Sequence, residues 1–289
     1  MKFQQTIANE LEICGQALHS GAMVKMHILP LPPNSGIYFS RPDLPGNPQV
    51  KADVNSVVDT KKSVTIGKDG WRVSTIEHLM AVFHGLGIDN ALVEVEGEEL
   101  PLGDAGDGSA LSFANRILKV GLVNQNEPRH YTYIREPIWV EGIVHKQDEP
   151  LKSMLIALPA DELQISFTFT SDHKTTGTQY FHYSLSDESF LKEIAPARTI
   201  AFMREIEYLR AQGLARSNDF NIAVIVSENG YQNELRFPEE IVRHKILDLI
   251  GDLYLAGPLV GHIIAIRSGH SLDWELGKKI FQQSLKMVR

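Results

Sequence analysis

Two similar stretches of sequence, one in each half of the chain, constrain the fold more than any other feature. Residues 77–97 (EHLMAVFHGLGIDNALVEVEG) and 243–270 (RHKILDLIGDLYLAGPLVGHIIAIRSGH) both run from a His-bearing apolar helix through glycines into an apolar strand. In each half, short strand-like runs precede this unit and an amphipathic helix follows it. We therefore predict an α+β fold of two related halves rather than one continuous parallel sheet. If the halves pack face to face, His78 and His244 occupy similar places on facing helices.

Turn-rich segments separate the expected elements, which have helical or strand-like patterns. In the first half we expect strands at 22–31, 36–41, 49–54 and 90–97, with helices at 74–87 and 109–121. In the second half we expect strands at 131–142, 153–159, 163–171, 221–227 and 262–270, with helices at 201–213, 239–257 and 273 to about 286. Ser74 or Thr75 is the expected N-cap of the helix at 74–87, and Gly85 and Gly87 suit its end. The polar, Pro-containing stretch 122–130 fits a linker, which predicts domains over 1–123 and 131–289.

The composition indicates a globular protein of the cytoplasm. Its 289 residues are 43% apolar and 22% charged, which suits one large or two medium-sized domains. A net charge of −8 disfavours a nucleic-acid-binding surface, but it allows a local basic pocket for a small phosphorylated ligand. Cys14 is the only cysteine, which excludes an internal disulfide and a thiolate zinc cluster. No signal peptide or transmembrane run is present, and we expect a cytoplasmic monomer.

The helix expected at 239–257 carries an unusual polar stripe. His244 and Asp248 are four residues apart and therefore lie on one face, with Asp252 one turn further along. Apolar residues occupy most of the remaining circumference, so carboxylates here are costly unless they are paired or bound to a cation. The spacing alone fits two structures, an exposed acidic stripe on an amphipathic helix or a metal site.

A second histidine, His78, lies on the apolar helix expected at 74–87 and directly follows Glu77. A catalytic zinc takes three protein ligands and keeps one position open. His78, His244 and Asp248 supply such a set, drawn from both halves, and Glu77 is placed to accept a proton from water at the metal. The alternative is that Glu77 belongs to a capping box, with His78 packed in the core behind it.

His270 and Thr199 complete the candidate residues. His270 is expected at the end of an apolar strand, where it can protonate a leaving amine, and Asp252 can orient its imidazole. Thr199 precedes an apolar segment expected to be helical, and its hydroxyl can donate to an oxyanion. The alternatives are a histidine in a surface loop and a threonine that only caps a helix.

Together these segments resemble the zinc-dependent UDP-3-O-acyl-N-acetylglucosamine deacetylases of lipid A biosynthesis. The matching motifs occur in order across nearly the whole chain: GQALHSG (15–21), VSTIEHLMAVFHGLGIDNALVEVEGEELPL (73–102), DGSA (107–110), ARTIAFMREIEYLRAQGL (197–214), LRFPEEIVRHKILDLIGDLYLAG (235–257) and SGHSL (268–272). The resemblance implies two domains of two layers each, with the helices sandwiched between two β-sheets. It also implies Zn²⁺ as cofactor and a UDP-linked, 3-O-acylated N-acetylglucosamine as substrate, from which acetate is released.

The resemblance further implies roles for individual residues. The positions that match zinc ligands are His78, His244 and Asp248. Glu77 matches the general base, and His270 matches the histidine that stabilises charge and protonates the departing amine. Asp252 matches the carboxylate partner of that histidine, and Thr199 matches the hydroxyl that holds the oxyanion. The positions that match the substrate site are Lys245, Ile200, Phe202 and Leu18, and an insert at about 200–226 matches the acyl passage.

Several departures from the family pattern concern the substrate rather than the metal. The usual Phe-Gly pair after the threonine is Ile200-Ala201 here, a Gly-Gly-Ser run is Ser217-Asn218-Asp219, and the loop before DGSA is longer. These changes leave open the acyl-chain length, and also a paralogous deacetylase for another N-acetylated sugar. Two further classes are a non-haem iron oxygenase, whose facial triad uses similar ligands, and a non-catalytic protein that binds a lipid-linked sugar nucleotide. The position of Glu77 disfavours the oxygenase, and the filled catalytic positions disfavour the binding protein.

Overall fold

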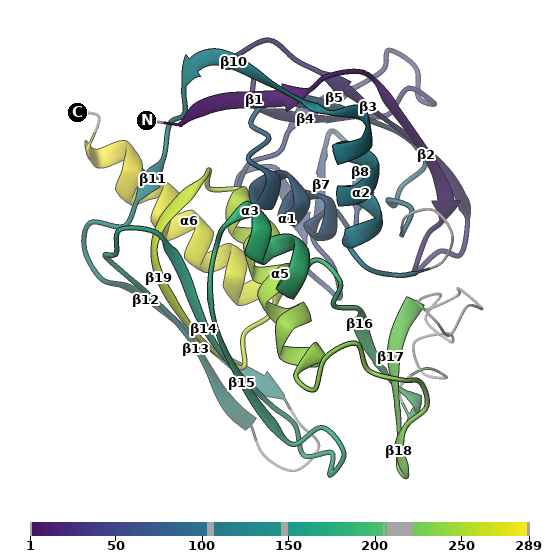
Figure 1. Cartoon of the computed structure of the whole chain (residues 1–289), viewed down its shortest axis with the longest axis vertical. Helices are drawn as coiled ribbons and strands as arrows, with labels where there is room; N and C mark the ends of the chain where they lie inside the picture. The colour runs from purple at the N-terminus through teal and green to yellow at the C-terminus, as the bar shows by residue number, and fades with distance from the viewer. Residues whose placement is uncertain (1, 103–106, 146–149, 205, 207–221, 288–289) are drawn as a thin grey trace.

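The computed structural model describes residues 2–102, 107–145, 150–204, 206 and 222–287. These residues form an α+β fold in which helices lie between two β-sheets (Figure 1). The predicted fold class is therefore confirmed, while the division into domains at 1–123 and 131–289 stays a prediction. Within the described ranges, no helix is long and apolar enough to cross a bilayer.

The first large sheet comes from the N-terminal part of the chain. Its strand order is β2 (Leu11–Gln16), β3 (Met23–Pro30), β9 (Ala91–Glu96), β4 (Ile37–Ser40) and β5 (Gln49–Lys51). Neighbouring strands are antiparallel except β9 and β4, which run parallel. Alternate residues of β3, namely Val24, Met26 and Ile28, are buried, so one face of the sheet packs on the core. This alternation is the pattern that predicts a strand at 22–31.

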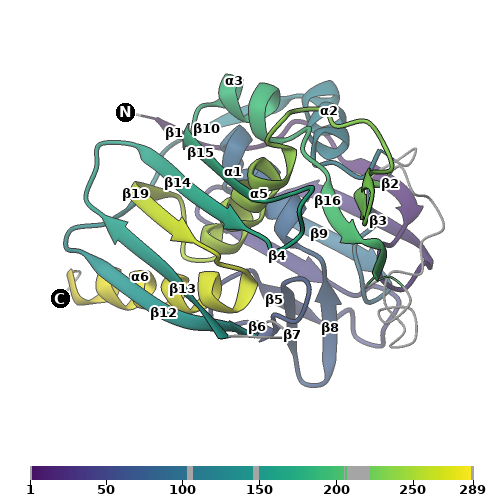
Figure 2. The same ribbon diagram turned by 90° about the horizontal axis from the view of Figure 1, so that it is seen from below.

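The second large sheet repeats this arrangement strand for strand. Its order is β12 (Ile138–His145), β13 (Pro150–Leu158), β19 (Leu259–Ile266), β14 (Leu163–Thr170) and β15 (Thr178–Ser184), which lie side by side in Figure 2. All neighbours are again antiparallel except one parallel pair, β19 and β14. The short strand β11 (Thr132–Tyr133) pairs with β19 outside this path. The shared order and directions bear out the prediction of two related halves.

The helices form the layer between the sheets. Helices α1 (Glu77–Leu86) and α2 (Leu111–Val120) lie under the first sheet, and α5 (Glu240–Tyr254) and α6 (His270–Met287) cover the second (Figure 1). Every residue of α1 is buried, as are all residues of α5 except Arg243 and Lys245. The two helices cross closely at Gly251, where a Cβ atom would lie 2.0 Å from the carbonyl oxygen of Glu77. The centre of the molecule is therefore a tight contact between α1 and α5.

Smaller elements lie at the edges of this framework. β1 (Phe3–Ile7) pairs with β10 (Leu122–Pro128), and β6 (Val57–Asp59), β7 (Thr65–Lys68) and β8 (Trp71–Ser74) form a three-stranded sheet. Another three-stranded sheet contains β16 (Thr199–Phe202), β17 (Ala223–Ser227) and β18 (Gly230–Tyr231), and it lies apart from the two large sheets in Figure 1. The helix α3 (Asp187–Ser189) and the π-helix η1 (Phe190–Ile194) precede β16.

Two predictions in the first half are wrong at the local level. The segment 122–130 is not a linker, because most of it is strand β10, antiparallel to β1. Its polar side chains are largely exposed, so no apolar alternation marks the strand. Helix α1 has Ile76 as its N-cap, without a side-chain cap. Thr75 cannot serve because its backbone is left-handed (φ 59°), and its hydroxyl bonds to Glu99 instead. The helix does end at Gly87, as predicted.

Two predictions in the second half also need correction. The strand expected at 262–270 ends at Ile266, and His270 opens helix α6 instead of closing the strand. The turn at Ser268 and Gly269 separates them, with the N–H of Leu272 bonded to the carbonyl of Gly269. The helix expected at 201–213 begins within a strand, since β16 pairs with β17 up to Phe202. Its part at 207–213 lies outside the described residues, as do positions 217–219 and most of the loop before DGSA.

Candidate active site

Two helices bring the three predicted metal ligands together. His78 is the second residue of α1, and His244 and Asp248 lie one turn apart on α5. The Oδ1 atom of Asp248 is 3.2 Å from Nε2 of His244 and 3.6 Å from Nε2 of His78. The imidazole rings meet edge to face, with centroids 5.1 Å apart. All three side chains are buried, which excludes the exposed acidic stripe that their spacing also fits.

The geometry of this cluster fits a metal ion. One ligand atom from each side chain lies within 4.8 Å of the other two. A tetrahedral site with bonds of about 2.0–2.1 Å places its ligand atoms about 3.3 Å apart, close to the separations of 3.2 Å and 3.6 Å found here. Nδ1 of His244 bonds the backbone carbonyl of Ala197 at 3.2 Å, so its Nε2 faces the cluster. Two imidazole nitrogens and one carboxylate oxygen suit a borderline cation such as zinc or iron.

The charges around the cluster also favour a cation. Burial lowers the pKa of His244 to about 4, so this ring is neutral at pH 7, as a metal ligand must be. Burial opposes a charge on His78 too, but Asp248 and Glu77 outweigh it and raise the pKa of that ring. The pKa values of the two rings shift in opposite directions because neighbouring imidazoles compete for one positive charge. Burial would raise the pKa of Asp248, yet its contacts with His244 and Lys245 hold it well below the ordinary value.

Glu77, the first residue of α1, lies beside this cluster. Its Oε2 atom accepts a hydrogen bond from the backbone N–H of Val64 at 2.9 Å, which fixes the orientation of the carboxylate. Oε1 lies 3.9 Å from Nε2 of His78, adjacent to the candidate ligands but outside their group. Because α1 begins without a side-chain cap, Glu77 forms no capping box. A fixed, buried carboxylate in this place can accept a proton from water.

His270 is held close to the cluster from α6. Its Nδ1 atom lies 2.8 Å from Oδ2 of Asp252, one turn beyond Asp248 on α5. Burial would lower the pKa of His270, but the charge and hydrogen bond of Asp252 raise it to about 10. The ring is therefore a protonated acid at neutral pH. The surface-loop alternative is wrong, since the side chain is only 12% exposed.

A pocket of about 530 Å³ opens beside these residues. Its lining includes His244, Asp248 and His270, together with Thr199 and Ile200 from β16. Since Thr199 is a strand residue, the alternative of a helix cap is wrong. Lys245 also lines the pocket, and its ammonium group bonds Oδ2 of Asp248 at 2.7 Å.

The other two predicted substrate contacts lie outside this pocket lining. Leu18 is partly buried just after β2. Phe202 closes β16, where its ring packs against that of His173 with centroids 5.6 Å apart. The structure therefore places Lys245 and Ile200 in the pocket, and Leu18 and Phe202 beyond it.

Three residues near the pocket have no individual role in the sequence analysis. Lys62 and Arg267 line the pocket with Lys245, which gives it three cationic side chains. His19 is close enough to the site that Lys62, His78 and His270 affect its pKa, which burial lowers against the opposing charge of Glu99. The motif GQALHSG is the one signal that includes His19. Glu141, Asp248 and Glu275 also line the pocket, so its wall carries both signs of charge, and composition alone cannot locate either.

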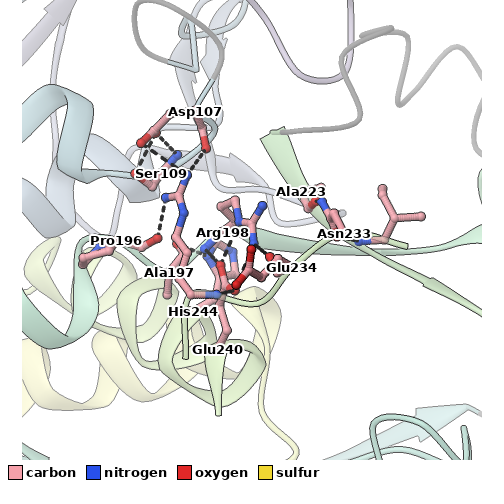
Figure 3. A network of polar contacts seen from close by, with 12 residues as sticks. Asp107, Ser109, Pro196, Ala197, Arg198, Ala223, Asn233, Glu234, Glu240 and His244 are labelled. Atoms are coloured by element: carbon pink, nitrogen blue, oxygen red, sulfur yellow. Dashed lines mark hydrogen bonds and ion pairs between the residues drawn. The ribbon is translucent and has the colours of Figure 1, made fainter. Parts of the chain in front are cut away.

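A buried ion pair supports the segments that carry Thr199 and His244. Nε of Arg198 lies 2.9 Å from Oε1 of Glu240, the first residue of α5, and both side chains are less than 10% exposed. Glu240 also accepts the backbone N–H of Arg198 at 3.0 Å. Figure 3 shows this pair beside His244, whose ring bonds the carbonyl of Ala197. The network ties β16 to α5, and no sequence signal joins two charges 42 residues apart.

Comparison with known proteins identifies the family of the chain. A family model described as LpxC, UDP-3-O-acyl N-acetylglycosamine deacetylase, matches residues 4–282. The chain belongs to this family. The match confirms the resemblance carried by the sequence motifs, and it spans both large sheets and every candidate site residue.

Several deacetylase relatives match nearly the whole chain. A protein of Syntrophus aciditrophicus is 38% identical over 98% of this chain and 87% of its own length. One of Myxococcus xanthus is 40% identical, covering 96% of this chain and 86% of its own. One of Trichormus variabilis is 39% identical, covering 97% of this chain and 99% of its own. All three are named UDP-3-O-acyl-N-acetylglucosamine deacetylase.

Proposed function

We propose that this protein is a cytoplasmic, zinc-dependent deacetylase that removes the N-acetyl group of UDP-3-O-acyl-N-acetylglucosamine in lipid A biosynthesis. The observation that carries the proposal is the buried His78, His244 and Asp248 cluster, with Glu77 and His270 beside it. The names of the relatives supply the substrate class. A carboxylate base and a protonated imidazole around one metal site serve amide hydrolysis, whereas an iron oxygenase requires neither.

The hydrolysis begins with addition of water to the acetyl carbon. His78, His244 and Asp248 would hold zinc, which would supply polarisation of the amide carbonyl and a lowered pKa of water. Glu77 accepts the proton of the attacking water, because the N–H of Val64 holds one carboxylate oxygen while the other faces the reaction. The new C–O bond turns the amide oxygen into an oxyanion, to which the hydroxyl of Thr199 donates a hydrogen bond.

The reaction ends when the C–N bond breaks. His270 gives the proton of its Nε2 atom to the departing amine, and acetate is released. Asp252 holds Nδ1 of the same ring at 2.8 Å, which orients the imidazolium and keeps it charged until the transfer. The proton taken up by Glu77 then passes to solvent, and His270 regains its own, so both groups return to their starting states.

The pocket lining suits a nucleotide sugar with an acyl chain. Lys62, Lys245 and Arg267 provide positive charge for a diphosphate. Ile200 and Leu272 add apolar surface. The family resemblance assigns the acyl passage to an insert at about 200–226, with Leu18 and Phe202 as further substrate contacts. Of this range, the structure describes strand β16 from Ile200 to Phe202 and strand β17 from Ala223.

An acetate-release assay on two substrates tests the proposal. UDP-3-O-(3-hydroxyacyl)-N-acetylglucosamine and unacylated UDP-N-acetylglucosamine are compared with the zinc-loaded protein, with Glu77→Gln as the inactive control. Because each buried methylene contributes about 0.8 kcal/mol, we expect kcat/KM to favour the acylated substrate by at least about a hundredfold. Equal rates would remove the lipid A assignment and leave a deacetylase. No acetate from either substrate, with zinc bound, would overturn the hydrolase itself.

A further inference from the structure

A second carboxyl group lies behind the His270–Asp252 pair and has no place in the mechanism above. Asp273, three residues after His270 on α6, is fully buried, and neither of its oxygens has a hydrogen-bond partner among the described residues. Oδ2 of Asp252 bonds His270, while its Oδ1 also has no partner within the described part of the chain. One oxygen of each carboxyl group and a ring nitrogen of His270 lie within 4.8 Å of one another.

Two ionised carboxylates are unfavourable in such a space. They repel each other, and burial removes the solvation that would offset the repulsion. A proton on one of them converts the repulsion into a hydrogen bond, as carboxyl pairs in other proteins show. Asp273 is the better holder of this proton, because the N–H of His270 favours the ionised form of Asp252. Asp273 has no such N–H donor among the residues described; the hydroxyl of Ser268 favours its ionised form but forms no close hydrogen bond with it.

The groups around Asp273 come from two helices and the turn before α6. Burial and then the charge of Asp252 raise the pKa of Asp273 to about 7. Lys245 on α5, His270 on α6 and the hydroxyl of Ser268 act in the opposite direction. Asp273 therefore changes its protonation state near neutral pH.

The groups around Asp252 extend this reasoning to the rest of the site. Burial raises the pKa of Asp252, and the charges of Glu77 on α1 and Asp248 on α5 add to this effect. The charge and the hydrogen bond of His270 oppose it. Negative charge thus accumulates behind His270, and a neutral Asp273 limits it.

We propose that Asp273 is a positioning residue whose protonated carboxyl group donates a hydrogen bond to Oδ1 of Asp252 and so holds Asp252 against His270. The inference rests on the proposed function, in which His270 is the acid. While Asp273 is neutral, one negative charge faces His270 from this side. When Asp273 ionises, a second charge faces the ring, the hydrogen bond is lost and His270 becomes a weaker acid. Turnover should therefore fall as the pH rises above neutrality.

Two substitutions with the same branched side-chain shape separate the hydrogen bond from the packing. Asp273→Asn keeps a donor that cannot ionise, whereas Asp273→Leu keeps the branched shape, with larger methyl groups, and removes the donor. We expect Asp273→Asn to retain kcat within about threefold and to keep it at higher pH than the wild type. Asp273→Leu should lose about tenfold or more in kcat with little change in KM, while folding and zinc content are unchanged. Equal losses in two folded variants would indicate a purely structural role and overturn the proposal.

A spectroscopic measurement tests the proton independently of activity. The ¹³C carboxyl signal of Asp273, assigned by its disappearance in Asp273→Asn, should show a protonated group at pH 6 in the zinc-loaded protein. An ionised signal at pH 6 would overturn the proposal even in a fully active enzyme. A protonated signal in a protein without deacetylase activity would support the carboxyl pair and count against the proposed function alone. A second equivalent of zinc, bound by the wild type and not by Asp273→Asn, would show that a cation rather than a proton joins the two carboxyl groups. That result would overturn the proposal.

Discussion

Replacing Gly251 by alanine should disrupt the site without altering any of its side chains. Gly251 lies on α5 between Asp248 and Asp252, where α5 crosses α1. An added Cβ would lie 2.0 Å from the carbonyl oxygen, 2.7 Å from the carbonyl carbon and 3.0 Å from the Cα of Glu77. All three are backbone atoms, so no side-chain rotation relieves the clash, and the helices must separate by about 1 Å.

This separation has two measurable costs. Overpacking of this kind lowers the free energy of unfolding by about 1–3 kcal/mol. It also moves His78 on α1 away from Asp248 on α5. Nε2 of His78 and Oδ1 of Asp248 are 3.6 Å apart in the wild type. Metal–ligand bonds tolerate deviations of about 0.2 Å, so a shift of about 1 Å should lower zinc affinity by at least about tenfold. Turnover should fall with zinc occupancy.

Urea denaturation and chelator competition for zinc measure these two costs. Gly277→Ala on α6 is the matched control, because its Cβ would first meet side-chain atoms of Val54 at 3.4 Å and Leu253 at 3.8 Å. These are ordinary contacts, so the control should be neutral or gain about 0.4–1 kcal/mol. If Gly251→Ala matched this control in both assays, the close helix crossing would not be what holds the ligands, and the reasoning would be refuted.

Three further predictions address separate parts of the site. Glu77→Gln should keep zinc but lose about two to four orders of magnitude in kcat. His78→Ala should lose zinc and turnover together, and full zinc occupancy in His78→Ala would contradict the ligand set. Asp252→Asn removes the charge that raises the pKa of His270, so the basic limb of the pH–rate profile should move to lower pH. Because that pKa is raised in the folded protein, the stabilisation from His270 is complete below about pH 6.5 and lost as pH rises toward about 10. Urea titrations of the wild type and Asp252→Asn at several pH values check this. If the free energy of unfolding had the same pH dependence in both proteins, the prediction would be contradicted. Chelation should lower the Tm, since a metal that binds only the folded state stabilises it, and a Tm insensitive to chelator would count against the site.

The candidate metal cluster could be predicted largely from the sequence because its spacing is local. His244 and Asp248 are four residues apart on one helix, a relation that any α-helical pattern makes explicit. The echo between the halves places His78 opposite them, and the structure brings the two rings to a centroid distance of 5.1 Å. Spacing alone did not separate a metal site from an exposed stripe. The burial of α5 decides this, and burial depends on the sheets around it.

The residues that sequence reasoning missed depend on long-range contacts or on backbone conformation. Arg198 and Glu240 meet across 42 residues, and either one alone resembles an ordinary surface charge. Asp273 resembles a favourable acid in the first turn of a helix, yet it is fully buried. Thr75 has a left-handed backbone that its residue type does not predict, so α1 begins at Glu77, later than its sequence pattern predicts. Such features follow from tertiary packing, which local patterns do not contain.

The repeated topology explains why the site lies between the halves. In each half, a buried helix precedes the central strand of the sheet, α1 before β9 and α5 before β19. When these helices pack together, corresponding positions supply the two imidazoles of one site. The halves differ in their acids: the first contributes Glu77, while the second contributes Asp248 and Asp252. Neither half therefore contains the complete set of proposed ligands or both members of the proposed acid–base pair. A change at the α1–α5 crossing should affect metal binding and turnover together, whereas a change at Lys62 or Arg267, on the pocket wall, should act mainly on substrate binding.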